Sequence, residues 1–288
     1  MVFSRLFRFV ILVGVVATVG GALPLAAGER HEAALVEQYR RDLEDRFTNS
    51  IGMEFRYIRP GSFQMGSVDA LAHPDEQPVH EVTIPQGFYL GVTEVTQAQW
   101  EAVMGYNPSL FKDPDRPVEK VAWLEVVQFI ERLNEKEGTD RYALPTEAEW
   151  EYACRAGSTS PWFWGDAPDP RFAWNRDNAG GTTQPVATRL PNAWGLYDMA
   201  GNVSEWCADL YANYPGSPLE PPAVDEHPAY VTRGGSWASR VEDLRSANRS
   251  RLWHHYRLSL TGFRVKARAL EAAPPSTGSA GEAGPGAR

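Results

Sequence analysis

Apolar side chains recur at helical spacing in two stretches of the chain. In residues 121–137, valine, phenylalanine, isoleucine and leucine side chains fall three or four positions apart, and Gly138 follows. This spacing places them on one face of a helix, and a glycine directly after such a pattern commonly ends the helix. Residues 96–104 show a similar apolar face, and Thr96 can cap the first turn. The pattern therefore predicts two amphipathic helices.

Capping chemistry predicts a third helix after Pro145. Thr146 and Glu149 stand three residues apart, the spacing at which each side chain accepts a hydrogen bond from the other residue's backbone N–H. Beyond Gly157 the sequence consists of short apolar runs separated by turn residues, and no helix is predicted there.

Alternation of apolar and polar residues indicates strands between these helices. Residues 53–65 alternate around Pro60 and Gly61, which predicts a hairpin with its turn at this dipeptide. Residues 80–84 and 88–90 are predicted as two further strands. Together with the helices, they indicate an α+β fold that is rich in coil.

The first 28 residues have the composition of a secretory signal peptide. Arg5 and Arg8 precede an apolar run over residues 9–19, and small residues follow. The run is shorter than the roughly 20 residues that a membrane span needs. We therefore expect export, cleavage and no stable membrane insertion afterwards, in the periplasm or outside the cell; an uncleaved anchor is the alternative.

Two flanking segments separate from the predicted domain. Residues 29–48 are interpreted as a helical spacer, because Val36, Tyr39, Leu43 and Phe47 form one apolar stripe; a partner-binding helix is the alternative. Residues 271–288 contain no aromatic residue and too little apolar surface to fold, so we expect a disordered tail. The folded domain is then expected over residues 49–270.

Composition excludes several classes of protein. The chain carries 37 acidic and 28 basic residues, a net charge of −9, and such a surface repels nucleic acid. Its two cysteines cannot build a disulfide scaffold or a four-thiolate zinc site. With 43% hydrophobic residues the chain can bury a core. We expect a globular monomer.

Seven strings in the folded part occur in an order that resembles a known family. They are residues 61–67 (GSFQMGS), 93–97 (TEVTQ), 144–153 (LPTEAEWEYA), 192–199 (NAWGLYDM), 201–206 (GNVSEW), 233–237 (RGGSW) and 262–264 (GFR). They resemble the sulfatase-modifying-factor family, whose best-known member is the formylglycine-generating enzyme, over residues 49–266. The resemblance implies a single compact domain of the C-type-lectin-like α+β type.

The loop over residues 195–206 can wrap a hard cation. Asp198 and Glu205 offer carboxylates, and the turn that contains Gly201 and Val203 can direct backbone carbonyls inward, which gives the oxygen ligands that calcium prefers. The resemblance implies the same four ligands, two by side chain and two by carbonyl, and hence a structural calcium ion. From the spacing alone, the alternative is that the two acids cap local turns.

One departure from the family bears on the chemistry. The catalytic members carry two cysteines shortly after the Gly-Gly-Ser-aromatic string, which bind copper(I) and oxidise a substrate cysteine; the matching positions here are Ser239 and Leu244. Copper(I) requires soft thiolate ligands, so copper and cysteine-to-formylglycine oxidation are not expected. Cys154 and Cys207 lie elsewhere in the sequence, and burial, a disulfide or a reactive thiol stay open for them.

The resemblance also implies a cleft near Gly234 and Gly235, for which Trp237, Ser239, Glu242 and Arg249 are the candidate residues; from the residues alone, the alternative is that the two glycines form a bulge in a core strand. Among fixed positive charges a carboxylate there could act as a general base. The alternative is that the charged residues form structural ion pairs.

Two functions are compatible with these features. The first is an exported family member that acts in the oxidative maturation of a peptide or peptide-derived substrate without the copper-cysteine mechanism; the resemblance extends to cysteine-less periplasmic relatives implicated in maturing a peptide siderophore. The second is a non-catalytic module that binds a peptide or sugar, since loops with Trp162, Trp164, Trp174 and Trp194 offer aromatic contact surface. A deep pocket with a buried carboxylate of raised pKa would favour the first function.

Overall fold

The computed structural model describes residues 45–220 and 227–269. The predicted signal peptide, most of the helical spacer and the predicted tail lie outside these ranges. In the described ranges, no helix combines the length and the apolar composition that crossing a membrane requires.

The three predicted helices are present: α3 (Gln97–Met104), α4 (Trp123–Glu137) and α5 (Glu147–Arg155). Thr96 caps α3 by accepting from the backbone N–H of Gln99 at 3.2 Å. Thr146 and Glu149 form the predicted capping box of α5. Gly138 ends α4 in the left-handed conformation, at φ 62°. These helix ends follow local rules of capping, which explains why the sequence predicts them well.

The strands form three sheets. The five-stranded sheet has the order β1 (Arg46–Thr48), β2 (Glu54–Ile58), β5 (Phe88–Gly91), β11 (Lys266–Arg268), β6 (Tyr142–Ala143). The four-stranded sheet has the order β10 (Thr261–Gly262), β7 (Ser204–Leu210), β8 (Ala229–Arg233), β9 (Arg249–Trp253), and a two-stranded ribbon pairs β3 (Gly61–Met65) with β4 (His80–Ile84). The 3-10 turns η1 (Pro74–Glu76) and η2 (Val241–Leu244) complete the described elements.

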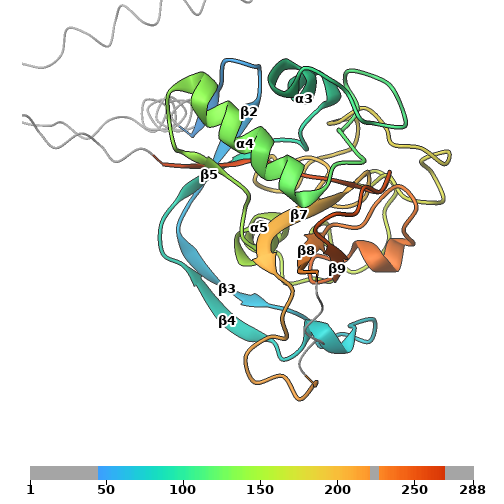
Figure 1. Ribbon diagram of the computed structural model, residues 1–288. Helices are drawn as coiled ribbons and strands as arrows, with labels where there is room; N and C mark the ends of the chain where they lie inside the picture. The colour runs from blue at the N-terminus through green and yellow to red at the C-terminus, as the bar shows by residue number, and fades with distance from the viewer. Residues whose placement is uncertain (1–44, 221–226, 270–288) are drawn as a thin grey trace, which may run out of the picture. The chain divides into compact units, whose positions relative to one another are not determined.

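Helix α5 contacts both the β3–β4 ribbon and strands β7 and β8. Figure 1 shows this arrangement, with α4 on the other side of α5 from the ribbon. The described residues from 45 to 269 belong to a single compact unit, as the α+β prediction of one domain expects.

One strand prediction and the end of one helix prediction are wrong. The expected hairpin of residues 53–65 does not form, because β2 pairs with β1 and β5 whereas β3 pairs with β4. The Pro60-Gly61 dipeptide instead passes the chain from one sheet to another. Alternation indicates a half-buried strand but does not identify its partner. Phe47, expected at the end of a helix, lies in strand β1 and stacks on Phe55 with ring centroids 4.6 Å apart.

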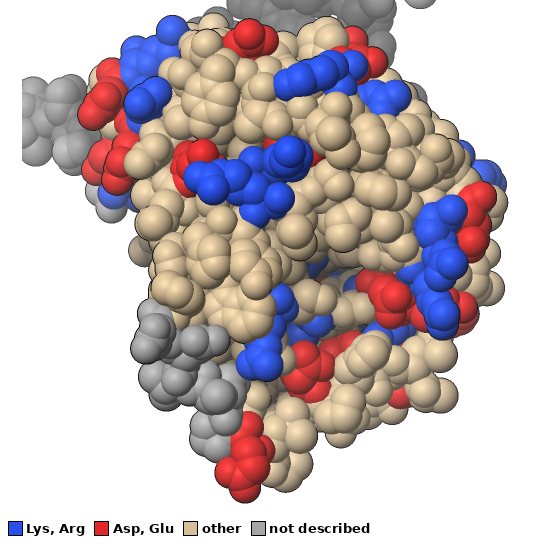
Figure 2. All heavy atoms as spheres, turned by 45° about the vertical axis from the view of Figure 1, so that its right-hand side comes forward, with Lys and Arg blue, Asp and Glu red and all other residues tan. Residues whose placement is uncertain are grey.

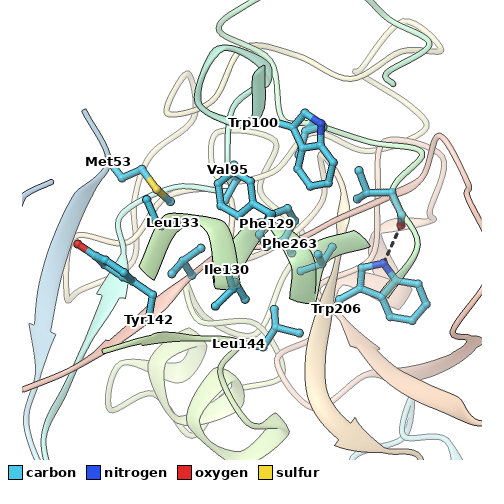
Figure 3. Close-up of a cluster of buried hydrophobic side chains, with 14 of the residues drawn as sticks. Met53, Val95, Trp100, Phe129, Ile130, Leu133, Tyr142, Leu144, Trp206 and Phe263 are labelled. Atoms are coloured by element: carbon cyan, nitrogen blue, oxygen red, sulfur yellow. Dashed lines mark hydrogen bonds between the residues drawn. The ribbon is translucent and has the colours of Figure 1, made fainter. Parts of the chain in front are cut away.

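Helix α4 buries its apolar face in the main core. Phe129 stacks on Trp100 with ring centroids 5.3 Å apart and meets Phe263 edge-on at 5.3 Å. Trp206 lies at the edge of this cluster, and its indole N–H donates to the carbonyl of Val121 at 3.0 Å, as Figure 3 shows. The core therefore joins α3, α4 and β7, which are far apart in the sequence.

Replacing Phe129 by alanine should lower the free energy of unfolding by about 3–5 kcal/mol, because the ring is fully buried and leaves a cavity. Leu124→Ala, on the exposed face of the same helix, should change it by less than about 0.5 kcal/mol. Denaturant unfolding of both variants measures the difference. Equal losses would show that this cluster is not the core.

Candidate functional site

The loop predicted to bind calcium has an unusual backbone. Asp198 and Asn202 adopt left-handed conformations at φ 54° and 53°, and Gly201 lies between them at φ 82°. A Cβ atom on Gly201 would lie 2.0 Å from the carbonyl oxygen of Trp174, so only glycine fits. The N–H of Gly201 donates to the carbonyl of Gly234 at 2.9 Å. This hydrogen bond ties the loop to the segment that contains Gly234 and Gly235.

Glu205 is held by a buried guanidinium. Arg264 donates to its two carboxylate oxygens, each at 2.7 Å, and Trp150 donates its indole N–H at 2.7 Å. Arg264 also donates to the carbonyls of Gly91 and Tyr197. Both members of the ion pair are buried. The pair therefore links β7 to the segment that follows β10.

Glu94 joins the same cluster, although the sequence did not single it out. Its carboxylate accepts from the N–H of Val203 at 3.0 Å and from the side-chain amide of Asn202 at 2.8 Å. Burial raises its pKa well above the ordinary value, and the charges of Asp198 and Glu205 raise the pKa further. No local sequence pattern connects Glu94 with this loop, because it lies 108 positions before Asn202.

Asp198 has one engaged and one unpartnered carboxylate oxygen. Oδ2 accepts from the N–H of Ala187 at 2.7 Å, whereas Oδ1 is buried with no hydrogen-bond partner among the described residues. Its pKa is raised to about 6, because burial outweighs that hydrogen bond and the positive charges of Arg264 and Arg189. An unpartnered, buried carboxylate oxygen is a suitable ligand for a hard cation.

Calcium itself stays a prediction. Among residues 45–220 and 227–269, no set of three or more His, Cys, Asp and Glu side chains is arranged to hold a metal ion. The predicted ligand set is not of that kind, because it consists of two carboxylates and two backbone carbonyls. Of the two carboxylates, that of Glu205 already binds Arg264. Asp198 is the one whose free oxygen fits the role.

Both cysteines are buried and free. Burial raises the pKa of Cys154 to about 12, and burial likewise raises the pKa of Cys207 well above the ordinary value. They belong to the second hydrophobic cluster, together with Trp150, and neither lines a described cavity. Cys154 lies beside the hydroxyl of Ser246. A thiol in such surroundings is inert as a nucleophile and as a metal ligand.

A polar cavity of about 280 Å³, which we call the Gly-Gly cleft, lies at Gly234 and Gly235 between η1, η2 and the start of β9. His73 and Asp243 face each other across it, with Nε2 and Oδ1 4.0 Å apart. Asp75 also lines it and accepts from the hydroxyl of Tyr211 at 2.6 Å. Figure 2 shows a hollow edged by acidic and basic side chains on this side of the molecule.

The structure places two of the four candidate cleft residues in this wall. Ser239 and Arg249 line the cleft, whereas Trp237 and Glu242 do not. Trp237 packs edge-on against Phe111 and donates its indole N–H to a backbone carbonyl. Glu242 is exposed on η2.

The side chains at the positions of the family's copper ligands are engaged differently. The Ser239 hydroxyl accepts from the backbone N–H of Ser236 at 3.0 Å, and Leu244 is buried in a hydrophobic cluster. Arg249 donates to both carboxylate oxygens of Glu147, at 2.8 and 2.7 Å. The pKa of Glu147 is nevertheless raised, because burial outweighs the charges of Arg233 and Arg249. Arg249 therefore lines the floor of the cleft with its charge already paired to Glu147.

Sequence reasoning missed His73 and Asp75 as cleft residues. They lie at η1, about 170 positions before the residues that they meet. His73 faces Asp243, and the carbonyl of Asp75 accepts from Arg249, which is 174 positions further along the chain. No local pattern marks them, since a histidine before a proline in a loop is common. Only the folded chain brings them opposite η2.

Comparisons of the amino-acid sequence with known proteins point to one family. Residues 42–269 match the sulfatase-modifying factor enzyme 1-like domain. The chaperone protein LppX of Paenibacillus barcinonensis is 32% identical over 205 residues, which is 54% of this chain and 70% of that protein. The formylglycine-generating enzyme of Thermomonospora curvata is 32% identical over 180 residues, 56% of each protein, so the chain spans about half the length of that enzyme.

A solved structure has the same fold. PvdO from Pseudomonas aeruginosa superposes with a TM-score of 0.68 at 30% identity, and the match covers 78% of this chain and 98% of that one. The described residues therefore have the formylglycine-generating-enzyme-like, C-type-lectin-like fold that the resemblance implies.

Proposed function

Since the chain belongs to the sulfatase-modifying-factor family, we propose that it is an exported member that acts on a peptide or peptide-derived substrate in the Gly-Gly cleft. The reaction would be an oxidative maturation that does not use a copper-binding cysteine pair. Export is supported by the basic, apolar and small residues at positions 1–28.

The observation that carries this proposal is the set of proton-transferring groups at the cleft. His73 and Asp243 lie 4.0 Å apart at its wall, and histidine exchanges protons at neutral pH. Asp75 offers a second carboxylate. Removal of two hydrogen atoms from a substrate releases two protons and two electrons; dioxygen as co-substrate would take the electrons and be reduced to hydrogen peroxide, and an imidazole at the cleft wall can accept a proton from the substrate. Gly234 and Gly235 let a substrate backbone approach closely.

The same cleft argues against the copper-thiolate route. Ser239 offers a hydroxyl where a thiolate would be needed, and Leu244 offers no ligand. Cys154 and Cys207 are buried, with raised pKa values, and line neither cavity. A substrate cysteine in the cleft would meet no protein thiol.

Calcium at the loop of residues 195–206 is also part of the proposal. Asp198 would hold it through its unpartnered oxygen and Gly201 and Val203 through their carbonyls, while Glu205 would share its carboxylate between the ion and Arg264. The ion would supply positive charge to a buried cluster in which neighbouring carboxylates raise the pKa values of Glu94 and Asp198. Its role is structural, since the cluster lies outside the lining of the Gly-Gly cleft.

Removing calcium should lower the melting temperature of the protein, because an ion that binds only the native state stabilises it by about 2.7 kcal/mol at 100 times its Kd. Scanning calorimetry with and without a chelator measures the shift. Asp198→Asn should reduce the shift, whereas Asp166→Asn, an exposed acid outside the cluster, should leave it unchanged. A melting temperature that does not respond to chelation would remove calcium from the account.

Turnover is tested with a pool of short peptides incubated with the protein in air and followed by mass spectrometry. We expect products two hydrogen atoms lighter than their substrates. His73→Ala should slow their formation by at least about 100-fold, the typical loss for a general base. His227→Ala, an exposed histidine that does not line the cleft, serves as the matched control.

Two other results of these experiments would contradict the proposal. Peptides that bind in the cleft with no mass change would indicate the non-catalytic binding module instead. Turnover that survives His73→Ala unchanged would remove the proposed role of this histidine.

A further inference from the structure

A second cavity, of about 730 Å³, lies between the β3–β4 ribbon, the end of α5 and the turn at residues 157–161. We call it the ribbon cavity. It shares no lining residue with the Gly-Gly cleft, and its volume is in the range of small-molecule sites. Nothing in the proposed function uses it.

Three aromatic rings form one wall of the ribbon cavity. Tyr152, on α5, meets Trp194 edge-on with ring centroids 4.9 Å apart, and Phe63, on β3, lies 5.3 Å from Tyr152. Gly61 lets the ribbon approach this wall, because a Cβ atom there would lie 2.4 Å from the Tyr152 hydroxyl. Tryptophan, tyrosine and phenylalanine rings attract cations through their electron-rich faces.

The one arginine in the lining has its charge paired within the protein. Arg155 is buried, and each of its three nitrogens already donates to a protein oxygen: Nε to Glu151 at 2.9 Å, Nη2 to Gly66 at 2.9 Å and Nη1 to Ser160 at 3.4 Å. Its charge is paired with Glu151, whose Oε1 lies 2.8 Å from Nη2. No lysine and no second arginine lines the cavity.

Two carboxylates line the ribbon cavity as well. Glu81, on β4, is exposed and forms no ion pair with any described residue. Asp69 accepts from the N–H of Leu71 at 2.8 Å and lies 4.0 Å from Arg245, whose guanidinium is bound to both carboxylate oxygens of Glu76. Asp69, which also accepts from the Ser67 hydroxyl, is thus engaged within the protein, and Glu81 supplies the negative charge of the rim that no ion pair among the described residues neutralises.

We propose that the ribbon cavity binds an organic amine cation on an apolar stem, with the stem against Phe63, Tyr152 and Trp194 and the charged end at Glu81. Aromatic walls with a carboxylate at the rim suit such a ligand, because the rings bind both the stem and the charge and the acid fixes the end. The cation is supplied either by the lysine side chain of a peptide or by a free diamine. This site is independent of the proposed function, because the two cavities have different linings.

The test is a titration of the full-length protein, followed by ¹H–¹⁵N NMR, with four probes. They are acetyl-Gly-Lys-Gly-amide, the same peptide with Nε-acetyl-lysine, 1,5-diaminopentane and lactose. We expect the lysine peptide or the diamine to shift the indole resonance of Trp194 and to bind at least about 10-fold more tightly than the acetylated peptide. Response to the peptide alone, the diamine alone or both identifies the source of the cation.

Two charge-neutralising variants localise the effect. Glu81→Gln should weaken binding at least about threefold, since it removes the ion pair between this exposed carboxylate and the amine of the ligand without disturbing the core. Glu101→Gln, which removes the same charge from the exposed face of α3, should leave binding unchanged. Equal binding of the acetylated peptide, preferential binding of lactose, the absence of any binding at millimolar concentration or unaltered binding by Glu81→Gln would each overturn the proposal.

Discussion

Buried arginine–glutamate pairs hold together a chain in which helices and strands are short. Three of them are bidentate and join segments 59, 102 and 169 residues apart. They are Arg264 with Glu205, Arg249 with Glu147, and Arg245 with Glu76. Removing one partner of such a pair leaves an uncompensated buried charge, which typically costs about 3–5 kcal/mol. The pairs thus tie β7, α5 and η1 to segments that lie far from them in the sequence.

These pairs also determine the chemistry of the Gly-Gly cleft. Because Arg249 is saturated by Glu147, the floor is polar but offers no free cation. The titratable groups left at the wall are His73, Asp75 and Asp243. The thiols lie in the hydrophobic core, where burial disfavours the thiolate. A site of this kind suits proton transfer rather than soft-metal chemistry.

The helices, the α+β class and the family could be predicted from the sequence, because capping residues such as Thr146 and Glu149 and short motifs act locally. Strand partners could not, and the predicted hairpin at Pro60-Gly61 failed because alternation does not encode pairing. The wall formed by His73 with Asp243 depends on residues 170 positions apart, which no local pattern connects. The loop of residues 195–206 was singled out from its motif, but the contact of Glu94 with this loop could be found only in the fold.

The central claim is that this cleft operates without a thiolate-bound metal. The most direct measurement incubates the full-length protein with copper(I), oxygen and a cysteine-containing sulfatase peptide, and quantifies aldehyde by hydrazide labelling and mass spectrometry. We expect no aldehyde above the level of a protein-free control, because Ser239 and Leu244 supply no thiolate. Copper-dependent, catalytic formation of formylglycine would contradict the account.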